Sequence, residues 1–581
     1  MPKGGTFLVE EVKPEDIFTP EDFSDEHKMV AGMVADFAQN EIAPHIDELE
    51  QLKYDLSRSL MAKAGELGLL SSDIPEEFGG GEMGTVTSAI IAENIVAGAS
   101  FAVSVIAHTG IGTLPIVFFG NEEQKKKYLP GLASGELVAA YALTEPGAGS
   151  DALNAKTKAV LSPDGKHYLI NGEKIFITNA GFADVYVTYA KVDGDKFTAF
   201  IVDKDTPGFS LGAEEKKMGI KGSSTRSLVF EDAQVPVENV LYEIGKGHVV
   251  AFNILNIGRF KLGASTAGSA KMALNTAVKF ALERQQFKMP IAKFGLIQKK
   301  IAEMAARTYA AESAVYRTAG LIEEGLEGVT GGHEAANRIE EFAIECSINK
   351  VHGSETLDFV VDENVQIHGG YGFVSEYPAE RMYRDSRINR IFEGTNEINR
   401  LIIPGTLLRR AMKGQIPLLP AAQALMGELL SVRAAAPSDG APLAAELAMV
   451  QAAKKIFLMV GGTAAQKYMD KIVHQQEIMG ILADLVIEAY AMETAVLRAQ
   501  KALLAGSGAE MKVMLATAYV HDTFPKIDLM AREALAAMFE GDMLRTQLSA
   551  LKKLARYNPV DIIGLKRKIA AKILEAEKYV V

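Results

Sequence analysis

The feature that most constrains the fold is a change of pattern in the middle of the chain. In residues 27–46 and 251–284, apolar residues return every three or four positions, which is typical of amphipathic helices. Between residues 141 and 243, short runs rich in β-branched and aromatic residues alternate with Asp-Gly, Asn-Gly and Pro-Gly turns. The sequence therefore predicts a mainly α protein with a central antiparallel β-domain.

This pattern divides the 581 residues into four expected regions. They are an N-terminal helical domain at 1–140, the β-domain at 141–245, a helical bundle at 246–407 and a C-terminal helical extension at 408–581. The segment at 301–317 aligns without gaps with that at 482–498, and seven of 17 positions are identical. The extension is then either a degenerate repeat of the bundle or a chance match between alanine-rich helices. We interpret the Pro/Gly/Ser-rich stretch at 434–442 as a mobile loop.

Charge and cysteine content exclude several classes of protein. The net charge is −13, with 39 basic and 57 acidic residues in 1–400 and 22 basic and 17 acidic residues in 401–581. The acidic body argues against nucleic-acid binding. The single cysteine, Cys346, excludes an intramolecular disulfide and a multi-thiolate site, and we expect no metal. No secretory signal is recognisable and no apolar run approaches 18 residues, so we expect no membrane span.

Two glycine-containing segments suit a bound ligand. In YALTEPGAGSD, residues 141–151, Gly147 and Gly149 allow close backbone approach, while Thr144 and Ser150 offer hydroxyls to a flat polar ring or a phosphate. The alternative is a plain Pro-Gly turn. In QIHGGYGFVSEYPAERMYRD, residues 366–385, two glycines again make room for a ligand. The alternative there is a structural, salt-bridged helix end.

The third segment, IFEGTNEINR at 391–400, contains a candidate general base. Glu393 follows Ile391 and Phe392 and precedes Gly394. An apolar approach of this kind would desolvate the carboxylate and raise its pKa from about 4.3 towards neutrality. The alternative is an ordinary glutamate in a surface turn.

Together with NGEKIFITNA at 171–180 and RQQFKMP at 284–290, these segments resemble the signatures of the acyl-CoA dehydrogenase family. The resemblance covers about residues 18–407. It is nearest to the very-long-chain branch, because FNILNIGRF at 252–260 and AKFGLIQKKI at 292–301 are similar to it and the chain continues well beyond Leu407. The resemblance implies an N-terminal helical domain, a middle β-domain and a helical bundle, with FAD at their junction in a homodimer or a dimer of dimers.

The resemblance also implies a reaction, the α,β-dehydrogenation of a long-chain fatty acyl-CoA to trans-2-enoyl-CoA, which is the first step of fatty acid β-oxidation. Glu393 would remove the α-proton while flavin N5 accepts the β-hydride, and the Glu393 backbone N–H would hold the thioester oxygen together with a flavin hydroxyl. Gly258 cannot serve as the alternative base that some branches carry before the arginine. The residues expected to contact the substrate are Ser150, Asn256, Arg259 and Gly394.

Two sets of residues are expected to bind FAD by the same resemblance. One set comes from the β-domain and the turn after Glu393: Tyr141, Leu143, Thr144, Gly149, Ser150, Phe176, Ile177, Thr178, Thr395 and Glu397. The other set would bind the adenine half across a subunit interface: Arg284, Gln286, Gln298, Gln366, Gly369 and Gly370. Phe176 stands where many relatives have Trp, and this chain contains no Trp.

Substrate length and partners are further expectations. By the resemblance, Val103 and Ala107 stand where medium-chain relatives have larger polar residues, which suggests a deeper apolar tunnel. Ile106 is bulkier than the residue expected in the very-long-chain branch, which favours long over very long chains. Electrons would pass to an electron-transfer flavoprotein, in the cytoplasm or, in a eukaryote, the mitochondrial matrix. A basic amphipathic stretch predicts peripheral contact with an inner membrane face, against the alternative of a solvated helix face; it comprises Lys566, Arg567, Lys568, Ile569, Lys572, Ile573 and Leu574.

Two other functions remain open on the sequence alone. An acyl-CoA oxidase would share the base and the flavin but would admit oxygen. An assembly or binding protein would capture a partner through the extension and retain residual dehydrogenase activity. The intact Glu393 argues against a purely non-catalytic role.

Overall fold

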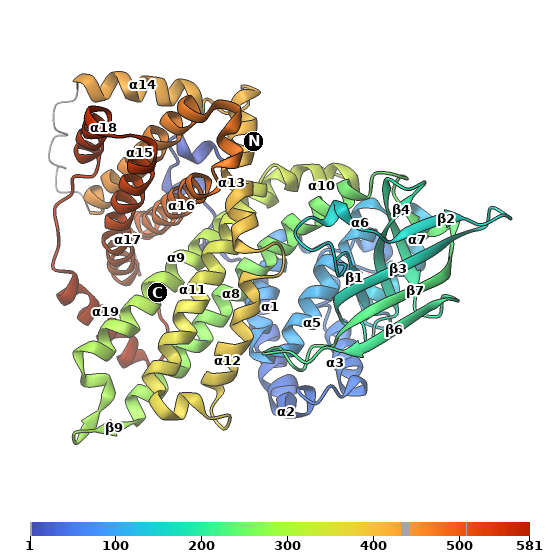
Figure 1. Ribbon diagram of the computed structural model, residues 1–581. Coiled ribbons are helices and arrows are strands. Elements are labelled where there is room, and N and C mark those ends of the chain that lie inside the picture. The colour runs from blue at the N-terminus through green and yellow to red at the C-terminus, as the bar shows by residue number, and fades with distance from the viewer. Residues whose placement is uncertain (1–2, 432–441, 507) are drawn as a thin grey trace.

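The computed structural model describes residues 3–431, 442–506 and 508–581. Three parts follow one another across the molecule, with the sheet at one end, the long helices in the middle and the extension at the other end (Figure 1). The stretch interpreted as a mobile loop, 434–442, lies outside the described residues except for Pro442.

The N-terminal helices pack beside the sheet. They are α1 (Asp25–Phe37), α2 (Ile46–Leu49), α3 (Tyr54–Glu66), α4 (Gly84–Asn94), α5 (Ser100–Ala107), α6 (Leu114–Phe119) and α7 (Glu122–Ser134). Within the described residues, one stretch is long and apolar enough to cross a membrane, Ser100–Phe119, with a mean hydropathy of 1.7. This corrects the prediction that no such run exists. The stretch is 72% buried, and a π-helical turn at His108–Gly112 separates α5 from α6, so it is a core element.

The β-domain is one twisted sheet in which β1 pairs at the side of β4. Its strands are β1 (Ala139–Ala142), β2 (Lys158–Leu161), β3 (His167–Thr178), β4 (Val185–Val192), β5 (Lys196–Asp203), β6 (Phe209–Glu214), β7 (Thr225–Pro236) and β8 (Val240–Leu241), in the order β6-β7-β3-β2-β4-β5-β8. Most neighbours are antiparallel as predicted, but β1 and β2 run parallel to β4. The register of β3 against β7 shifts between Lys174 and Ile177, and Phe176 there has a φ of 59°. This bulge lets Phe176 and Ile177 face different surroundings.

The bundle is built on α8 (Gly247–Glu283), α9 (Gly295–Leu326) and α11 (Ala343–His368). Shorter helices complete it: α10 (Gly332–Glu340), α12 (Pro378–Ser386) and α13 (Asn396–Met412), with a hairpin of β9 (Gln285–Gln286) and β10 (Met289–Pro290) after α8. Helices α8 and α11 approach closely because Gly263 lies against Asn349 and Gly353 against Thr266. Helices α10 and α11 follow each other directly and are separated near Phe342.

The extension adds a second helical layer to the bundle. It comprises α14 (Leu418–Ser431), α15 (Ala444–Tyr468), α16 (Gln476–Ala505), α17 (Ala509–Met538), α18 (Gly541–Leu554) and α19 (Ile562–Ala576). Their apolar faces share one core with α8, α9 and α11.

Helices α9 and α16 contact each other reciprocally. Arg317 pairs with Glu493 at 3.0 Å, and Arg498 pairs with Glu312 at 2.6 Å. In the alignment of 301–317 with 482–498, Glu312 corresponds to Glu493 and Arg317 to Arg498. The arginine of each segment therefore forms an ion pair with the glutamate of the other segment, and this symmetry favours a degenerate repeat over a chance match. The duplication itself stays a prediction.

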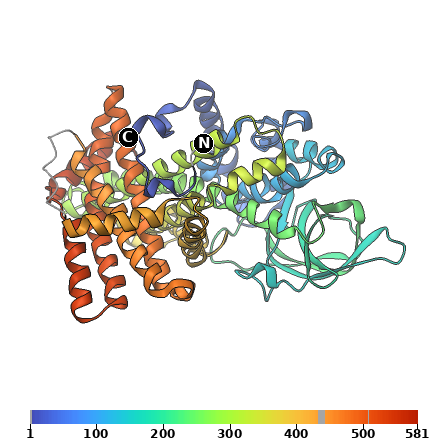
Figure 2. The same ribbon diagram turned by 90° about the horizontal axis from the view of Figure 1, so that it is seen from above.

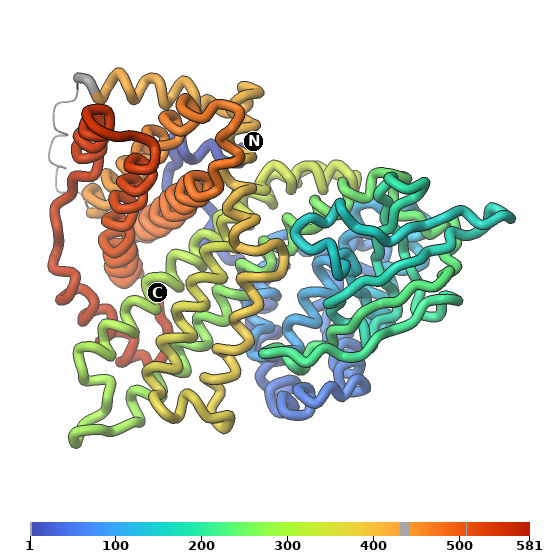
Figure 3. Tube along the Cα trace, in the orientation of Figure 1, coloured from blue at the N-terminus to red at the C-terminus, as the bar shows by residue number. Residues whose placement is uncertain are grey.

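The start of the chain joins the core of the extension rather than that of the N-terminal helices. Phe7 and Leu8 are buried there, and the Phe7 ring lies 4.8 Å from that of Tyr490. Further along, Arg498 donates to both carboxylate oxygens of Glu21. Figures 2 and 3 show both ends of the chain beside the bundle and the extension.

Helix α19 does not offer its apolar face to a membrane. Ile569 and Ile573 are buried in the core shared with α9 and α17. Lys566 donates to Glu303 at 2.7 Å and to Asp522 at 2.8 Å, and Lys572 donates to Glu510 at 2.8 Å. The predicted lipid contact through this stretch is therefore unsupported, because the face that would enter the lipid is already covered. Arg567 and Lys568 are exposed, as the alternative of a solvated helix face expects.

Candidate active site

Glu393 lies in a tight turn immediately before α13. Its φ is 56° and that of Gly394 is 78°, so a non-glycine residue is held in the left-handed region. Thr395 caps α13, its Oγ1 accepting from the Ile398 N–H at 3.2 Å. The Asn399 amide donates to the carbonyls of Gly394 at 2.8 Å and Thr395 at 3.1 Å. The turn is therefore fixed by side chains of the helix that follows it.

The carboxylate of Glu393 is desolvated. Its Oε2 is buried and makes no hydrogen bond to any described residue. Burial raises the pKa of Glu393 to about 7, although Arg259 and Lys350 both act to lower it. A β-carbon on Gly258 would overlap this oxygen, so glycine at 258 leaves room for the carboxylate. The expectation of a raised pKa agrees with this geometry.

Arg259 and Asn256 of α8 face the same turn. The buried Arg259 donates from Nε to the Glu393 carbonyl at 3.3 Å and from Nη1 to Asn256 Oδ1 at 2.8 Å. Burial raises the pKa of Tyr141 in β1, and the nearby charge of Glu393 adds to this shift. The side chains of Tyr141 and Glu393 therefore lie close together. The structure thus gathers three of the predicted substrate residues, Asn256, Arg259 and Gly394, around Glu393 and β1.

The loop after β1 forms an open cradle on a rigid base. Nothing lies within 4 Å of a β-carbon built on Gly147 or Gly149, and Ser150 is exposed. Beneath the loop, Glu145 accepts from Lys174 Nζ at 2.7 Å and from the Thr157 N–H at 3.1 Å. Lys174 is fully buried, and desolvation lowers its pKa to about 8. The predicted site residues omitted this ion pair, although both residues lie within the segments that carry the resemblance.

The remaining predicted residues of this set line the cradle or support it. Phe176 is 60% exposed, whereas Ile177 is buried and Thr178 is half-buried. Leu143 is buried behind the loop, while Thr144 is half-buried and Glu397 is exposed on the first turn of α13. An open glycine loop, an exposed aromatic ring and accessible hydroxyls fit a flat ring bearing a phosphate arm.

The second predicted set meets at a different end of the bundle. Arg284 lies over the Tyr371 ring at 5.2 Å, and Phe280 stacks on His368 at 4.1 Å, which joins the ends of α8 and α11. Gln286, Gln366, Gly369 and Gly370 are exposed there, and Gln298 is part-buried and donates to the Ala292 carbonyl. In Figure 1 this end, marked by β9, lies far from β1. One chain therefore presents the two sets on separate surfaces.

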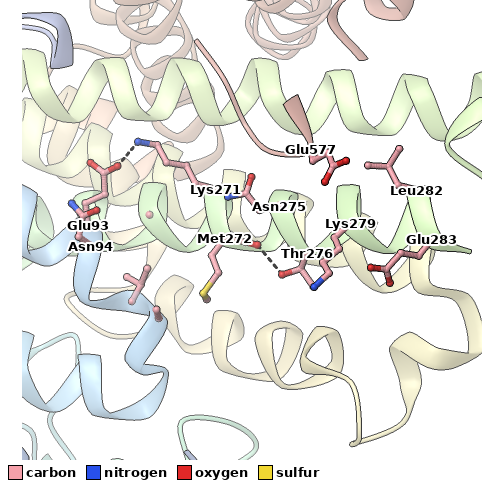
Figure 4. Close-up of a pocket in the computed structure, with 13 residues that line it drawn as sticks. Glu93, Asn94, Lys271, Met272, Asn275, Thr276, Lys279, Leu282, Glu283 and Glu577 are labelled. Carbon is pink, nitrogen blue, oxygen red and sulfur yellow. Dashed lines mark hydrogen bonds and ion pairs between the residues drawn. The ribbon is translucent and has the colours of Figure 1, made fainter. Parts of the chain in front are cut away.

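A pocket of about 790 Å³ lies elsewhere, along α8 between α4 and the end of the chain. Figure 4 shows Glu93, Lys271, Asn275 and Glu577 on its walls. No predicted site residue lines it, and the Lys271 ammonium is already paired with Glu93 and Glu312. This pocket is not the site of chemistry around Glu393.

Sequence reasoning also missed Lys350 of α11. Its Nζ donates to Asn396 Oδ1 at 2.6 Å, and burial lowers the pKa of Lys350 to about 7. A lysine surrounded by buried positions in a long helix is the signal that could have indicated it.

The chain was compared with known proteins. Four domain models match it: the acyl-CoA dehydrogenase N-terminal domain at 24–136, the middle domain at 140–233, and two different models described as the C-terminal domain, at 245–408 and 452–553. A probable acyl-CoA dehydrogenase of Bacillus subtilis is 57% identical, covering 100% of this chain and 98% of the relative. The human mitochondrial very long-chain specific acyl-CoA dehydrogenase is 37% identical, over 81% of this chain and 74% of its own length.

Among solved structures, the acyl-CoA dehydrogenase of Bacillus anthracis complexed with FAD is 57% identical. It has a TM-score of 0.99 and covers 100% of both chains. The similarity thus extends through the extension and not only through the first three regions.

Proposed function

The chain belongs to the acyl-CoA dehydrogenase family, and from that premise we propose that it converts long-chain fatty acyl-CoA to trans-2-enoyl-CoA with FAD as cofactor. The observation that carries the proposal is Glu393, with its buried Oε2 and a pKa raised to about 7, close to Tyr141 of β1, the strand that leads into the open glycine cradle. A base near neutrality is matched to removing the weakly acidic proton α to a thioester.

The residues of the cradle would hold FAD. Thr144, Gly149 and Ser150 offer hydroxyl and backbone groups, and Phe176 with Thr178 forms a wall for the ring. The FAD complex of the Bacillus anthracis relative supports this assignment. When bound, FAD would supply the two-electron acceptor for the β-hydride.

The protein's own part in the reaction is to move one proton and stabilise one charge. Ionised Glu393 accepts the α-proton at its carboxylate. Arg259 donates to the Glu393 carbonyl and so helps to hold the turn that carries the Glu393 backbone N–H, the group proposed to bind the thioester oxygen. Gly258 keeps the space beside the carboxylate clear.

The proposal includes long substrates and an electron-transfer flavoprotein as acceptor. Val103, Ile106 and Ala107 of α5 are each half-buried on the described chain, which is the exposure expected of residues that contact an acyl chain. Similarity to very long-chain specific relatives supports this choice. We place the enzyme in the cytoplasm.

The test is an anaerobic titration of the purified protein with acyl-CoAs of graded length, read as bleaching of the flavin absorbance. We expect bleaching by long chains and its loss in Glu393→Gln. Protein that neither copurifies with flavin nor binds added FAD would refute the proposal. Rapid reoxidation by oxygen without another acceptor would instead indicate an oxidase.

A homodimer would bring the two FAD-binding sets together, because they lie on separate surfaces of one chain. Arg284→Ala and Glu393→Gln provide a complementation test. Each variant alone should be inactive, since the first lacks a cofactor contact and the second lacks the base. Mixed dimers should regain activity, because one of their two sites combines Glu393 from one chain with Arg284 from the other. No recovery in verified mixed dimers would refute binding of FAD across an interface.

A further inference from the structure

The C-terminal extension contacts the same helix that carries the catalytic turn. We infer that Asp484 of the extension is a positioning residue for Glu393, acting through Arg400, Glu355 and Asn396. The inference rests on the proposed role of Glu393 as the base. It assigns the extension a part in catalysis in addition to packing on the bundle.

The first link joins α16 to α13 and α11. Arg400, one turn beyond the start of α13, donates from Nε to Asp484 Oδ1 at 2.7 Å. Its two terminal nitrogens donate to the two carboxylate oxygens of Glu355 at 2.7 and 2.9 Å. A planar guanidinium group whose three nitrogens all donate hydrogen bonds is held in one orientation. Asp484 therefore orients the Arg400 guanidinium toward Glu355.

The second link runs from Glu355 to the first residue of α13. Asn396 Nδ2 donates to Glu355 Oε1 at 3.0 Å, and Asn396 Oδ1 accepts from Lys350 Nζ at 2.6 Å. Asn396 is only 1% exposed, and no water is needed to complete its contacts. Both ends of its amide are thus held by residues of α11.

Asn396 in turn fixes the place of Glu393. Asn396 lies three positions after Glu393, and the turn between them begins with left-handed backbone at Glu393 and Gly394. Such a conformation persists when surrounding contacts determine it. Contacts to Thr395 and Gly394 come from Asn399, and contacts to Asn396 come from the network that begins at Asp484.

A purely adhesive role for Asp484 is the competing explanation, and the chain contains a matched control for it. Asp522 of α17 pairs with Lys566 at 2.7 Å, and Lys566 also pairs with Glu303 of α9. The Asp522 side chain is 33% exposed, and that of Asp484 is 32% exposed. Each aspartate therefore belongs to a set of ion pairs that connects the extension to the bundle. The set that contains Asp522 leads to α19 and α9, however, and not to α13.

The experiment compares Asp484→Asn with Asp522→Asn in the full-length holoenzyme. We expect Asp484→Asn to reduce the rate constant for flavin bleaching at saturating long-chain acyl-CoA by roughly tenfold, since small misplacements of a base are costly. The apparent Kd for acyl-CoA should stay within about twofold, because no substrate contact changes. Asp484→Glu should recover most of the rate, and Asp522→Asn should match the wild type.

A second readout does not depend on activity. Hydrogen exchange of the peptide covering 391–400 should be faster in Asp484→Asn than in either the wild type or Asp522→Asn. Equal rates and equal exchange in the two asparagine variants would overturn the inference. A wild type that fails to bleach would instead refute the proposed function, and the exchange comparison would still test the positioning network.

Discussion

Ionisation of Glu393 should control the pH dependence of the reaction. A carboxyl group with a pKa of about 7 is roughly 9% ionised at pH 6 and roughly 91% at pH 8, so kcat/KM should rise about tenfold across this interval. With the ordinary value of 4.5, the group would be roughly 97% ionised at pH 6, and the profile would be nearly flat.

The same pKa shift predicts an effect on stability with a defined sign. Because the folded-state pKa lies above the unfolded-state value of 4.5, ionisation favours unfolding, and stability is lost as the pH rises from about 4.5 to about 7. At 1.36 kcal/mol per pKa unit, the cost is about 2 kcal/mol at pH 6 and about 3 kcal/mol at pH 8. Glu393→Gln cannot ionise, so its advantage in stability over the wild type should grow by about 1 kcal/mol between these pH values.

Two assays check this reasoning on the same preparations. Initial rates of anaerobic flavin bleaching at low acyl-CoA give the pH profile of the free enzyme, and urea unfolding at pH 6 and pH 8 gives the stability difference. A flat rate profile between pH 6 and 8, or a stability difference that does not grow with pH, would refute the claim that Glu393 is desolvated.

Three further predictions follow from buried charges. Lys350→Met removes one of the two cations that lower the pKa of Glu393 and leaves Arg259 in place. The pKa should therefore rise, and the acidic limb of the kcat/KM profile should move to higher pH. A limb that stays in place or moves to lower pH would contradict this prediction. Lys174→Met leaves a glutamate buried without its cation beneath the cradle, and we expect a loss of about 3–5 kcal/mol in unfolding free energy together with a lower FAD content, measured by absorbance. Arg498→Met should lower the unfolding free energy by a similar amount and expose the extension to limited proteolysis. Arg545→Met, which removes an exposed ion pair, should lower it by only about 0–1 kcal/mol. Equal losses in the two variants would show that burial of the ion pair is irrelevant.

Local sequence was sufficient to predict several parts of the site. The segments that contain Gly147, Gly149 and Glu393 can be recognised from the sequence. Glycine widens the backbone conformations available at its own position, and glutamate places a titratable charge there. The raised pKa of Glu393 followed from its apolar neighbours in sequence. The structure adds Arg259 and Lys350, which partly oppose that shift.

Tertiary contacts decided what the apolar faces pack against. Helix α19 has a basic amphipathic pattern that suits a lipid surface equally well, but Ile569 and Ile573 are covered by helices of the same chain. The run Ser100–Phe119 has the composition of a membrane span, yet it is mostly buried inside the protein. Periodicity identifies an apolar face but carries no information about which surface covers it.

The sequence alone thus determined the types of secondary structure and the residues of the three motifs, because both depend on residues near one another in the chain. The structure decided the partnerships between distant residues. Glu145 with Lys174 under the cradle, Lys350 beside Asn396, and Asp484 with Arg400 join segments separated by tens of residues. Burial and electrostatic interaction arise from all neighbours in space, so these pairs became visible only after the helices and strands were packed.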